Sequence, residues 1–319
     1  MNVFKLFKNK TVVVTGHTGF KGSWLSLWLS LLGAKVIGIS KSVPTKPSNF
    51  QILNLKKKII DKRIDLKDKK KIKKLFKFYK PDFVFHLAAQ ALVRKSYISP
   101  IETYHSNTIG TLNILESLRV LKKKCAVVLI TSDKVYKNIE TNKGYKENDV
   151  LEGKDPYSGS KVAAENIIAS YLSSFFDGKK SKILICVARA GNVIGGGDWS
   201  SDRIIPDCVK SWSKNKIPEI RNPNSTRPWQ HVLEAVGGYL VLGSNLFRNK
   251  KFHGQSFNFG PLSKKNYKVI ELLKSLQLNW KDKKWNINKK NQNLFESKLL
   301  SLDVSKAKKY LKWRNILSF

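Results

Sequence analysis

Short apolar runs alternate with amphipathic stretches along the first two thirds of the chain. Residues 11–15 (TVVVT) are β-branched and end at a glycine, which predicts a buried strand. Residues 23–32 carry apolar side chains at helical spacing, and the pattern stops at Gly33. A second short apolar run, residues 34–40 (AKVIGIS), follows. These segments predict one strand–helix–strand unit.

The same alternation continues to residue 190. The expected segments are, in order, a lysine-rich helix ending near Pro81, a strand at 82–88 (DFVFHLA), a helix from about Ser106, a strand at 126–132 (AVVLITS), a helix after Pro156 and a strand at 182–190 (KILICVARA). Strands that alternate with helices in this way indicate an α/β fold in which helices cover both faces of a parallel sheet. We therefore expect a Rossmann-like, doubly wound domain.

The pattern changes at about residue 191. Beyond this point the alternation weakens, and Gly, Pro, Trp and Arg become dense in residues 191–207 (GNVIGGGDWSSDRIIPD) and 222–232 (NPNSTRPWQHV). Such stretches are typical of loops and short helices. We expect residues 1–190 to form the Rossmann-like domain and residues 191–319 to form mostly a smaller C-terminal lobe.

The strongly basic composition does not by itself identify a partner. A net charge of +37, from 60 Lys and Arg against 23 Asp and Glu, usually indicates nucleic acid or an anionic membrane. Only nine of the basic residues are arginine, and the lysines are spread through segments such as residues 56–80. Solvated helix faces explain this distribution, so we expect no nucleic acid and no membrane partner.

The cysteines and the first residues narrow the class of protein further. Cys125, Cys186 and Cys208 lie far apart and show neither a C-x-x-C nor a Cys/His pairing, so we expect no disulfide framework and no metal site. The chain starts without the apolar segment of a signal peptide. Its longest apolar run, residues 24–34, is too short to span a bilayer. We expect a cytoplasmic protein.

Three glycines lie in the turn between the first expected strand and the first expected helix. Gly16, Gly19 and Gly22 would let a pyrophosphate approach the N–H groups of a helix N-terminus, although tight helix–strand packing is an alternative. The second strand ends in Ser40 and Lys41, without the carboxylate that usually binds an adenosine ribose. The glycine turn therefore predicts a dinucleotide site and leaves NADP open beside NAD.

A tyrosine and a lysine four residues apart suggest acid–base chemistry. Tyr157 and Lys161 lie in DPYSGSKVAAE at the start of an expected helix, where this spacing puts both on one face. An ammonium beside a phenol lowers the pKa of the phenol and makes it available as a base near neutral pH. The same spacing also arises by chance in so lysine-rich a chain.

The motifs TGxxGxxG, HLAAQ, TSDK and YSGSK, in this order, resemble the extended short-chain dehydrogenase/reductase family over roughly residues 10–260. Within that family, GHTGFKGSWL, ITSDKVY and the two glycine- and tryptophan-rich stretches are most similar to the 4,6-dehydratases that act on CDP-glucose. The resemblance implies an NAD-binding domain, a lobe that closes on a nucleotide-diphospho-sugar, and a homo-oligomer, usually a dimer across two helices. Sister dehydratases, an epimerase, and an inactive NAD(H)-binding protein are the alternatives.

The resemblance also implies catalytic roles. Tyr157, aided by Ser132 and Lys161, would remove the proton of the sugar 4-hydroxyl as hydride leaves C4 for the nicotinamide. Ser132 stands where the family commonly has threonine. Asp133 would be the acid and Lys134 the base of the dehydration. In related dTDP-glucose dehydratases the residue after the aspartate resembles glutamate, so Lys134 favours the CDP-sugar branch but leaves the C5 base open. A solvated turn at the strand end is the alternative.

Cofactor contacts are implied at the glycine turn and at the strand ends. The positions are Gly16, Thr18, Gly19, Phe20, Gly22, Asp65, Leu66, Leu87, Ala88, Ala89, Tyr157 and Lys161. Asp65 lacks the usual preceding glycine because Ile64 stands there, so a plain surface aspartate is the alternative. We expect His86 to be a packed strand residue. Asn107 would kink a helix and help to position the lysine, or it would simply cap a helix.

Substrate contacts are implied in the second lobe. Asn192, Arg203 and Arg227 are the candidates, because guanidinium forks suit a pyrophosphate. Trp199 and Trp229 would line a base pocket or belong to the core. Family members usually continue some tens of residues beyond the SLDVSKAKKYLKW motif, so we also expect the last helix to be missing from this chain.

Overall fold

The computed structural model describes residues 3–141, 143–177, 181–261, 267–280, 283–287 and 299–317. Within these ranges, a seven-stranded sheet has the order β11-β6-β5-β4-β1-β2-β3, and every pairing in it is parallel. The strands are β1 (Thr11–Thr15), β2 (Lys35–Ser40), β3 (Ile60–Arg63), β4 (Phe83–His86), β5 (Cys125–Ile130), β6 (Ile183–Ala190) and β11 (Ser256–Phe259). The predicted α/β, Rossmann-like, doubly wound sheet is confirmed.

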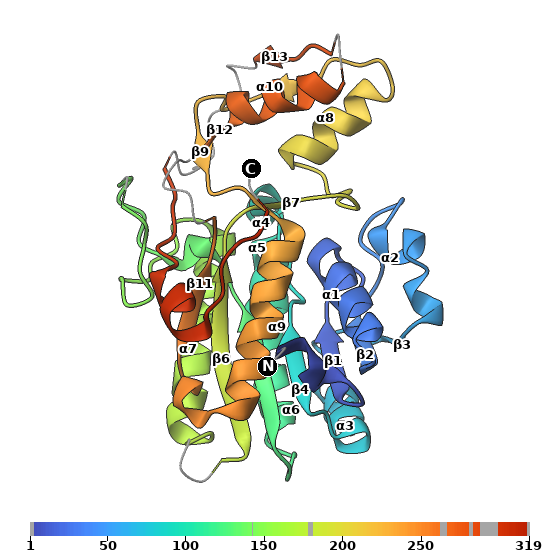
Figure 1. Cartoon of the computed structure of the whole chain (residues 1–319), viewed down its shortest axis with the longest axis vertical. Coiled ribbons are helices and arrows are strands. Elements are labelled where there is room, and N and C mark those ends of the chain that lie inside the picture. The colour runs from blue at the N-terminus through green and yellow to red at the C-terminus, as the bar shows by residue number, and fades with distance from the viewer. Residues whose placement is uncertain are drawn as a thin grey trace.

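Helices cover both faces of this sheet (Figure 1). One face carries α1 (Phe20–Leu31) and α9 (Val232–Arg248), and the other carries α3 (Lys69–Tyr79), α6 (Gly110–Leu118) and α7 (Pro156–Ser174). Along β1 the side chains alternate between two cores: Val12 and Val14 pack with α1 and α9, and Val13 packs with α3 and α6. Burial on both faces explains why these strands are continuous apolar runs.

Shorter elements connect these segments. They are η1 (Val3–Phe7), α2 (Asn49–Ile52), η2 (Leu55–Lys57), α4 (Val93–Ile98), α5 (Pro100–Tyr104), the π-helix η3 (His105–Ile109), η4 (Asp133–Val135), β7 (Val193–Ile194), β10 (Gln230–His231), η5 (Lys250–Phe252) and the π-helix η6 (Ala307–Leu311).

A second lobe lies beyond one end of the sheet (Figure 1). It contains α8 (Ile204–Trp212), α10 (Val269–Asn279) and two small sheets, which pair β8 (Glu219–Ile220) with β13 (Asn286–Ile287) and β9 (Thr226–Arg227) with β12 (Tyr267–Lys268). Cys208, Trp212, Ile220 and Leu273 form a hydrophobic cluster of its own. The rings of Trp212 and Trp280 meet edge to face at 5.7 Å.

Two elements differ from the sequence-based interpretation. The lysine-rich segment 56–80 is not helical throughout, because β3 precedes α3 and forms the edge of the sheet. Edge strands tolerate charged side chains on their exposed face. Beyond residue 191, α9 and β11 pack on the main sheet rather than in the lobe. The division at residue 191 stays a prediction.

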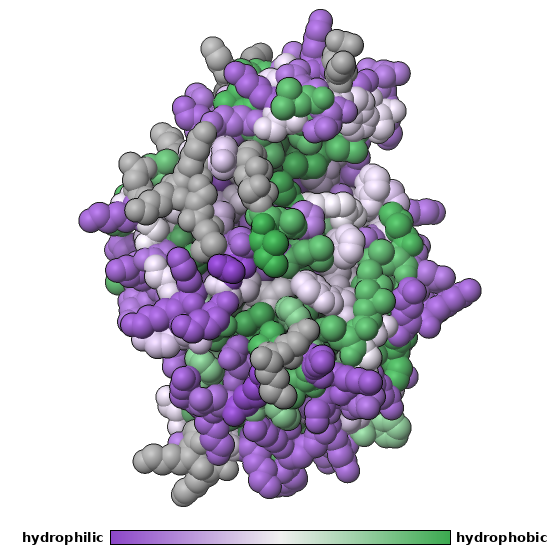
Figure 2. Space-filling view, viewed as in Figure 1, coloured by the Kyte–Doolittle hydropathy of each residue, from purple (hydrophilic) through white to green (hydrophobic). Residues whose placement is uncertain are grey.

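Figure 2 shows hydrophilic side chains over much of one face and apolar side chains gathered where the lobe meets the sheet. Among the described residues, no helix is both long and apolar enough to cross a membrane. The same residues contain no cluster of His, Cys, Asp and Glu that could hold a metal ion. Cys125, Cys186 and Cys208 are free thiols and buried.

Candidate active site

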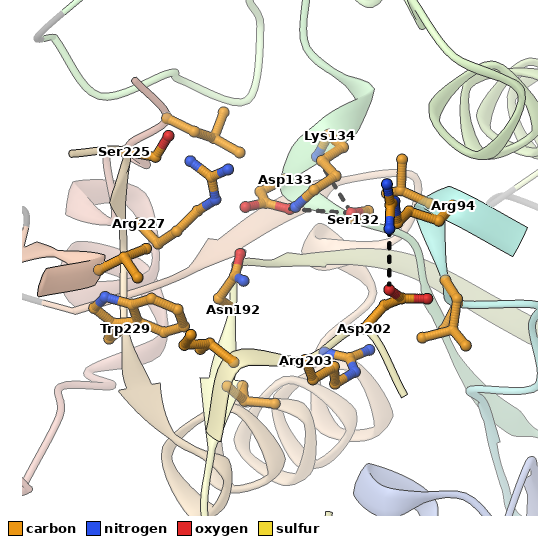
Figure 3. A pocket seen from close by; sticks show the side chains of 18 of the residues that line it. Arg94, Ser132, Asp133, Lys134, Asn192, Asp202, Arg203, Ser225, Arg227 and Trp229 are labelled. Atoms are coloured by element: carbon orange, nitrogen blue, oxygen red, sulfur yellow. Dashed lines mark hydrogen bonds and ion pairs between the residues drawn. The ribbon is translucent and has the colours of Figure 1, made fainter. Parts of the chain in front are cut away.

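A cavity of about 420 Å³ lies between the lobe and the ends of the strands (Figure 3). Eight residues singled out from the sequence line it: Ser132, Asp133, Lys134, Tyr157, Asn192, Arg203, Arg227 and Trp229. Loops that follow the carboxyl ends of neighbouring parallel strands meet at the same edge of a sheet, and this brings residues after β5 and β6 together. Trp199 does not line the cavity.

The turn after β5 holds three of the predicted catalytic residues. The Ser132 hydroxyl accepts a hydrogen bond from the Lys134 N–H at 3.2 Å and so caps η4. Asp133 Oδ1 accepts from Ser132 Oγ at 3.0 Å and from Lys134 Nζ at 3.3 Å. Asp133 is only 1% exposed. The turn is therefore buried, which argues against the alternative of a solvated strand end.

Helix α7 presents the predicted base. Asp155 caps the helix, because its carboxylate accepts from the N–H groups of Tyr157 at 2.9 Å and Ser158 at 3.0 Å. Ser158 Oγ accepts in return from the Asp155 N–H at 3.1 Å, and Pro156 occupies the first turn. This capping box fixes where the helix starts. It places Tyr157 in the first turn and Lys161 one turn later.

The pKa of Tyr157 differs from the expectation. Burial raises the pKa of Tyr157 to about 12, although a hydrogen bond from Ser132 acts in the opposite sense. Burial lowers the pKa of Lys161 to about 8, with the Glu165 charge opposing it, and Lys161 Nζ donates to the Ile130 carbonyl at 3.3 Å. The expectation of a lowered tyrosine pKa is wrong, because desolvation of the phenolate outweighs the favourable contacts.

Several buried polar atoms of the cavity have no hydrogen-bond partner within the described part of the chain. They are Asp133 Oδ2, Asn192 Oδ1, Arg203 Nε and Trp229 Nε1. For Arg203 Nε the Asp198 carboxylate lies 3.7 Å away, which is an ion pair beyond hydrogen-bond distance. Figure 3 shows Asp133, Asn192 and Arg227 directed toward one space. Buried polar groups normally have partners, so this set indicates a polar ligand.

Arginine is concentrated at the cavity. Four of the nine arginines in the chain line it: Arg94, Arg203, Arg221 and Arg227. Asp202 Oδ1 pairs with Arg94 at 3.6 Å and with Arg221 at 3.2 Å. Guanidinium groups bind phosphate oxygens in bidentate geometry, so the cavity suits a diphosphate. Sequence reasoning missed Arg94 and Arg221, and the scarcity of arginine was the signal that could have found them.

The glycine turn fits a pyrophosphate. Gly16 has a φ of +76°, and a Cβ on it would lie 2.7 Å from the Ala88 nitrogen. A Cβ on Gly22 would lie 2.0 Å from the Gly16 carbonyl oxygen. Gly19 caps α1 without a side-chain hydrogen bond, so the first N–H groups of the helix lack the usual side-chain acceptor. Close packing of α1 against β1 and access of a phosphate to the helix N-terminus therefore both require glycine at positions 16 and 22.

The remaining cofactor candidates lie near this turn and at strand ends. Thr18 Oγ1 donates to the Ser42 carbonyl at 2.7 Å, and the Leu87–Ala88 backbone lies against Gly16. Asp65 follows β3, and its partly exposed carboxylate pairs with Lys41 at 3.2 Å. The cofactor roles of Thr18, Phe20, Asp65, Leu66, Leu87, Ala88 and Ala89 stay predictions.

Two buried polar residues connect β4 and η3 to the site. His86 hydrogen-bonds Thr15 at 2.7 Å and Thr111 at 3.1 Å, and burial lowers its pKa to about 3. His86 is thus a neutral, packed strand residue. Asn107 lies inside the π-helix η3 and donates to Ser160 Oγ at 2.9 Å. It bonds to the neighbour of Lys161 rather than capping a helix.

Lys21 is a further cavity residue that sequence reasoning missed, although it stands inside the glycine motif. Its Nζ donates to Tyr239 Oη at 3.4 Å. Burial, followed by the charge of Arg203, lowers the pKa of Lys21 to about 8. This residue adds a titratable amine to the cationic wall of the cavity.

A family model and a curated relative both match this chain over most of its length. The model of the family described as GDP-mannose 4,6 dehydratase matches residues 13–319. A CDP-glucose 4,6-dehydratase of Salmonella typhimurium is 44% identical over 312 residues, which cover 96% of this chain and 86% of that protein.

Solved structures are similar in fold. An epimerase of Methanothermobacter thermautotrophicus superposes with a TM-score of 0.84 at 24% identity, covering 100% of this chain and 91% of that one. A dTDP-glucose 4,6-dehydratase of Streptomyces venezuelae, solved with NAD and TYD bound, gives 0.80 at 20% identity, covering 97% and 93%. At these identities the likeness shows the fold alone.

Proposed function

We infer that this chain, which belongs to the GDP-mannose 4,6-dehydratase family, is a CDP-glucose 4,6-dehydratase. It converts CDP-D-glucose to CDP-4-dehydro-6-deoxy-D-glucose with loss of water. The sugar nucleotide that it forms is a precursor of deoxysugars. The observation that carries this choice of nucleotide is the 44% identity to a CDP-glucose 4,6-dehydratase across 96% of the chain. The cavity supports the choice of reaction, because it brings together the hydroxyl, carboxyl and amine groups that such a dehydration needs.

The cofactor is NAD. The N–H groups at the start of α1 would hold its pyrophosphate, with Gly16 and Gly22 leaving room for close approach. When bound, NAD accepts a hydride from C4 of the sugar and later returns it to C6, so it is regenerated in each cycle. Asp65, at the end of β3, would bind the adenine.

The oxidation half of the reaction is assigned to Tyr157, Ser132 and Lys161. Tyr157 would remove the proton of the sugar 4-hydroxyl. Ser132 hydrogen-bonds the phenol, and the charge of Arg203 also favours the phenolate, which opposes the burial that raises the pKa of Tyr157. Lys161, on the same face of α7, supplies a neighbouring amine.

The elimination half is assigned to the turn after β5. A ketone at C4 acidifies the proton on C5, which Lys134, as the free amine, would remove while Asp133 protonates the departing 6-hydroxyl to water. Lys134 would return this proton to C5 when the hydride reaches C6. Asp133 Oδ1 is occupied by Ser132 and Lys134, whereas Oδ2 has no partner among the described residues. Oδ2 is therefore the oxygen that would carry the transferred proton.

The diphosphate of the substrate would lie among the cavity arginines. Arg203 and Arg227 were expected in this role, and Arg94 and Arg221 extend the same cationic wall. Asn192 Oδ1 and Trp229 Nε1 offer an acceptor and a donor toward the nucleotide-sugar. This arrangement favours a substrate with negative charge at its centre and hydroxyl groups beside it.

The assembly proposed is a homodimer. Four apolar side chains are exposed on neighbouring turns of α4, α5 and η3: Ile98, Ile101, Tyr104 and Ile109. Three of them line a shallow groove with Pro100 and His105. Clustered exposed apolar residues mark interaction sites, and a second copy of this chain would cover them.

Mass spectrometry of candidate substrates tests the proposed function. CDP-glucose, dTDP-glucose and GDP-mannose are each incubated with the purified protein and NAD, and the products are also separated by chromatography to detect epimers. Loss of one water from CDP-glucose alone is the expected result. Loss of water from another sugar nucleotide indicates a sister dehydratase, a product of unchanged mass indicates an epimerase, and NAD binding without any product indicates an inactive relative.

A further inference from the structure

A buried ion pair joins the helix and the sheet that carry the catalytic residues, and no step above uses it. Arg189 of β6 donates to Glu165 of α7 through two parallel hydrogen bonds, Nε to Oε1 and Nη2 to Oε2, both 2.8 Å long. The two side chains are 4% and 6% exposed. The bidentate contact fixes both the distance and the relative orientation of the two groups.

The same pair is bonded to both ends of the catalytic turn. Thr131, directly before Ser132, donates through Oγ1 to Glu165 Oε1 at 2.6 Å. On the other side, Tyr136 Oη accepts from Arg189 Nη1 at 2.9 Å. The residues between these two anchors include the predicted acid and base. The turn is thus fixed to the ion pair at its start and at its end.

Glu165 also belongs to the helix that carries the predicted oxidation residues. It follows Lys161 by four residues and Tyr157 by eight, so the three side chains lie along one face of α7. A shift of α7 along or around its axis would break the contacts of Glu165 with Arg189 and Thr131. One carboxylate therefore couples the position of α7 to the position of the turn.

We propose that the Arg189–Glu165 pair is a positioning device that holds the elimination residues of the turn in register with the oxidation residues of α7. The inference rests on the proposed dehydratase function, in which both sets must act on one sugar ring. Thr131 and Tyr136 line the cavity, whereas Arg189 and Glu165 do not, so the effect of the pair reaches the substrate through the residues that it holds.

Stability alone does not account for this pair. Burying two charges carries a desolvation penalty, and apolar residues of similar volume often stabilise a core as well or better. What apolar side chains cannot provide is a fixed geometry with specific polar partners, which here are Thr131, Tyr136 and the Glu147 carbonyl. Misplacement of reacting groups by about 1 Å can reduce a rate by about a hundredfold, so a dehydratase gains from fixed geometry at this position.

A double variant removes the anchors and keeps the ion pair. In Thr131→Val/Tyr136→Phe both hydroxyls are lost, while Arg189 and Glu165 still bind each other. We expect kcat for CDP-glucose to fall by about tenfold to a hundredfold with KM unchanged. A folded double variant with wild-type kcat, or with a loss confined to KM, would overturn the proposal.

The chain offers a matched control of the same chemistry. On α6, Glu116 accepts from Arg119 at 2.7 Å and from Tyr171 Oη at 2.9 Å, away from the cavity. Tyr171→Phe and Glu116→Gln should leave kcat unchanged. If they reduce kcat as much as the test variants do, the effect is not specific to the turn and the proposal fails.

A second variant separates positioning from stability. Glu165→Leu/Arg189→Met replaces the pair by apolar side chains of similar size, and we expect it to stay folded while kcat falls as in the first variant. Wild-type kcat in this protein would mean that the pair serves packing only and would overturn the proposal.

A crystal structure of Thr131→Val/Tyr136→Phe provides a readout independent of turnover. We expect the Ser132–Lys134 turn to be displaced relative to Tyr157, and unchanged positions would contradict the proposal whatever the substrate. A wild-type protein that fails to dehydrate CDP-glucose counts against the function. An active wild type that is indifferent to these substitutions counts against the positioning role alone.

Discussion

The two carboxylate oxygens of Asp133 have different surroundings, and this difference bears on the proposed elimination step. Oδ1 accepts hydrogen bonds from the Ser132 hydroxyl and from Lys134 Nζ, whereas the buried Oδ2 has no partner in the described structure. Because Oδ1 already has two partners, Oδ2 is the oxygen that would deliver the proton to the departing 6-hydroxyl. Asp133 and Lys134 would then act at the two ends of the C5–C6 bond of the sugar, Asp133 on the C6 oxygen and Lys134 on the C5 proton.

The role of Lys134 is tested by replacing it with alanine. In Lys134→Ala the oxidation residues are intact, so CDP-4-keto-glucose and reduced NAD should accumulate while water loss slows by at least about a hundredfold. Near-ultraviolet absorbance follows the reduced NAD, and mass spectrometry follows the sugar. In Tyr157→Phe neither signal should appear, because the first proton is not removed.

Lys137→Ala provides the control for this experiment. Lys137 lies three residues further along and pairs with Glu152 at 3.0 Å on the surface, so its loss should not change turnover. Water loss at the wild-type rate in Lys134→Ala would remove Lys134 as the C5 base.

For individual residues, the sequence predicts which side chains line the same cavity, but it does not predict their pKa values. Ser132, Asp133, Lys134 and Tyr157 line one cavity, as the order of motifs after parallel strands leads one to expect. The pKa of Tyr157 is nevertheless raised, not lowered, because burial depends on every segment that covers the phenol. Spacing along one helix contains no information about those segments.

Among the elements, the turn between β1 and α1 is the most constrained by backbone contacts. In Gly22→Ala the new Cβ would start 2.0 Å from the Gly16 carbonyl oxygen, so the turn must open. We expect NAD affinity to fall by more than about tenfold, or 1.4 kcal/mol, as measured by titration calorimetry. Gly196→Ala is the control, because its Cβ would meet no atom within 4 Å. Unchanged affinity in Gly22→Ala would contradict a pyrophosphate site at this turn.

His86, at the end of β4, should make the free energy of unfolding depend on pH. His86 is buried and neutral, and its pKa is lowered to about 3 from the 6.5 of a free histidine. Below a pH of about 6.5 the unfolded chain binds a proton that the folded chain does not. The free energy of unfolding therefore falls by up to about 1.4 kcal/mol for each unit by which the pH is lowered. Above that pH the residue contributes no slope.

Urea unfolding of wild type and His86→Gln at several pH values between about 7 and 5 measures this contribution. The variant should lose the part of the slope that corresponds to one proton, up to about 1.4 kcal/mol per pH unit. If His86→Gln keeps the full slope, other groups are responsible for the pH dependence.

Element type could be predicted more reliably than element placement. The apolar runs of β1, β4, β5 and β6 are recognisable because both faces of these strands are buried. β3 was missed because an edge strand retains charged residues, here Lys62 and Arg63. Helical periodicity could not show that α9 returns to the main sheet, because that contact joins residues far apart in sequence.

For the whole molecule, the two basic residue types are distributed differently. The chain carries 51 lysines (60 basic residues less nine arginines), mostly on solvated surfaces, while four arginines line the cavity between lobe and sheet. Arginine holds a planar, bidentate phosphate contact that lysine cannot reproduce. The high net charge therefore reflects the lysine-rich surface, whereas the proposed diphosphate site rests on a few arginines that the net charge does not reveal.

A single charge should disrupt the proposed dimer interface. Ile101 is 74% exposed in the apolar groove formed by α5 and η3, and Ile101→Glu would place a charge in the proposed dimer interface. Light scattering should give a dimer for the wild type and a monomer for the variant, because a buried unpaired carboxylate costs several kcal/mol. Leu278→Glu is the control, since Leu278 is 80% exposed on α10 of the lobe and should leave the dimer intact. A monomeric wild type would contradict the dimer, and dissociation by Leu278→Glu alone would place the interface on the lobe.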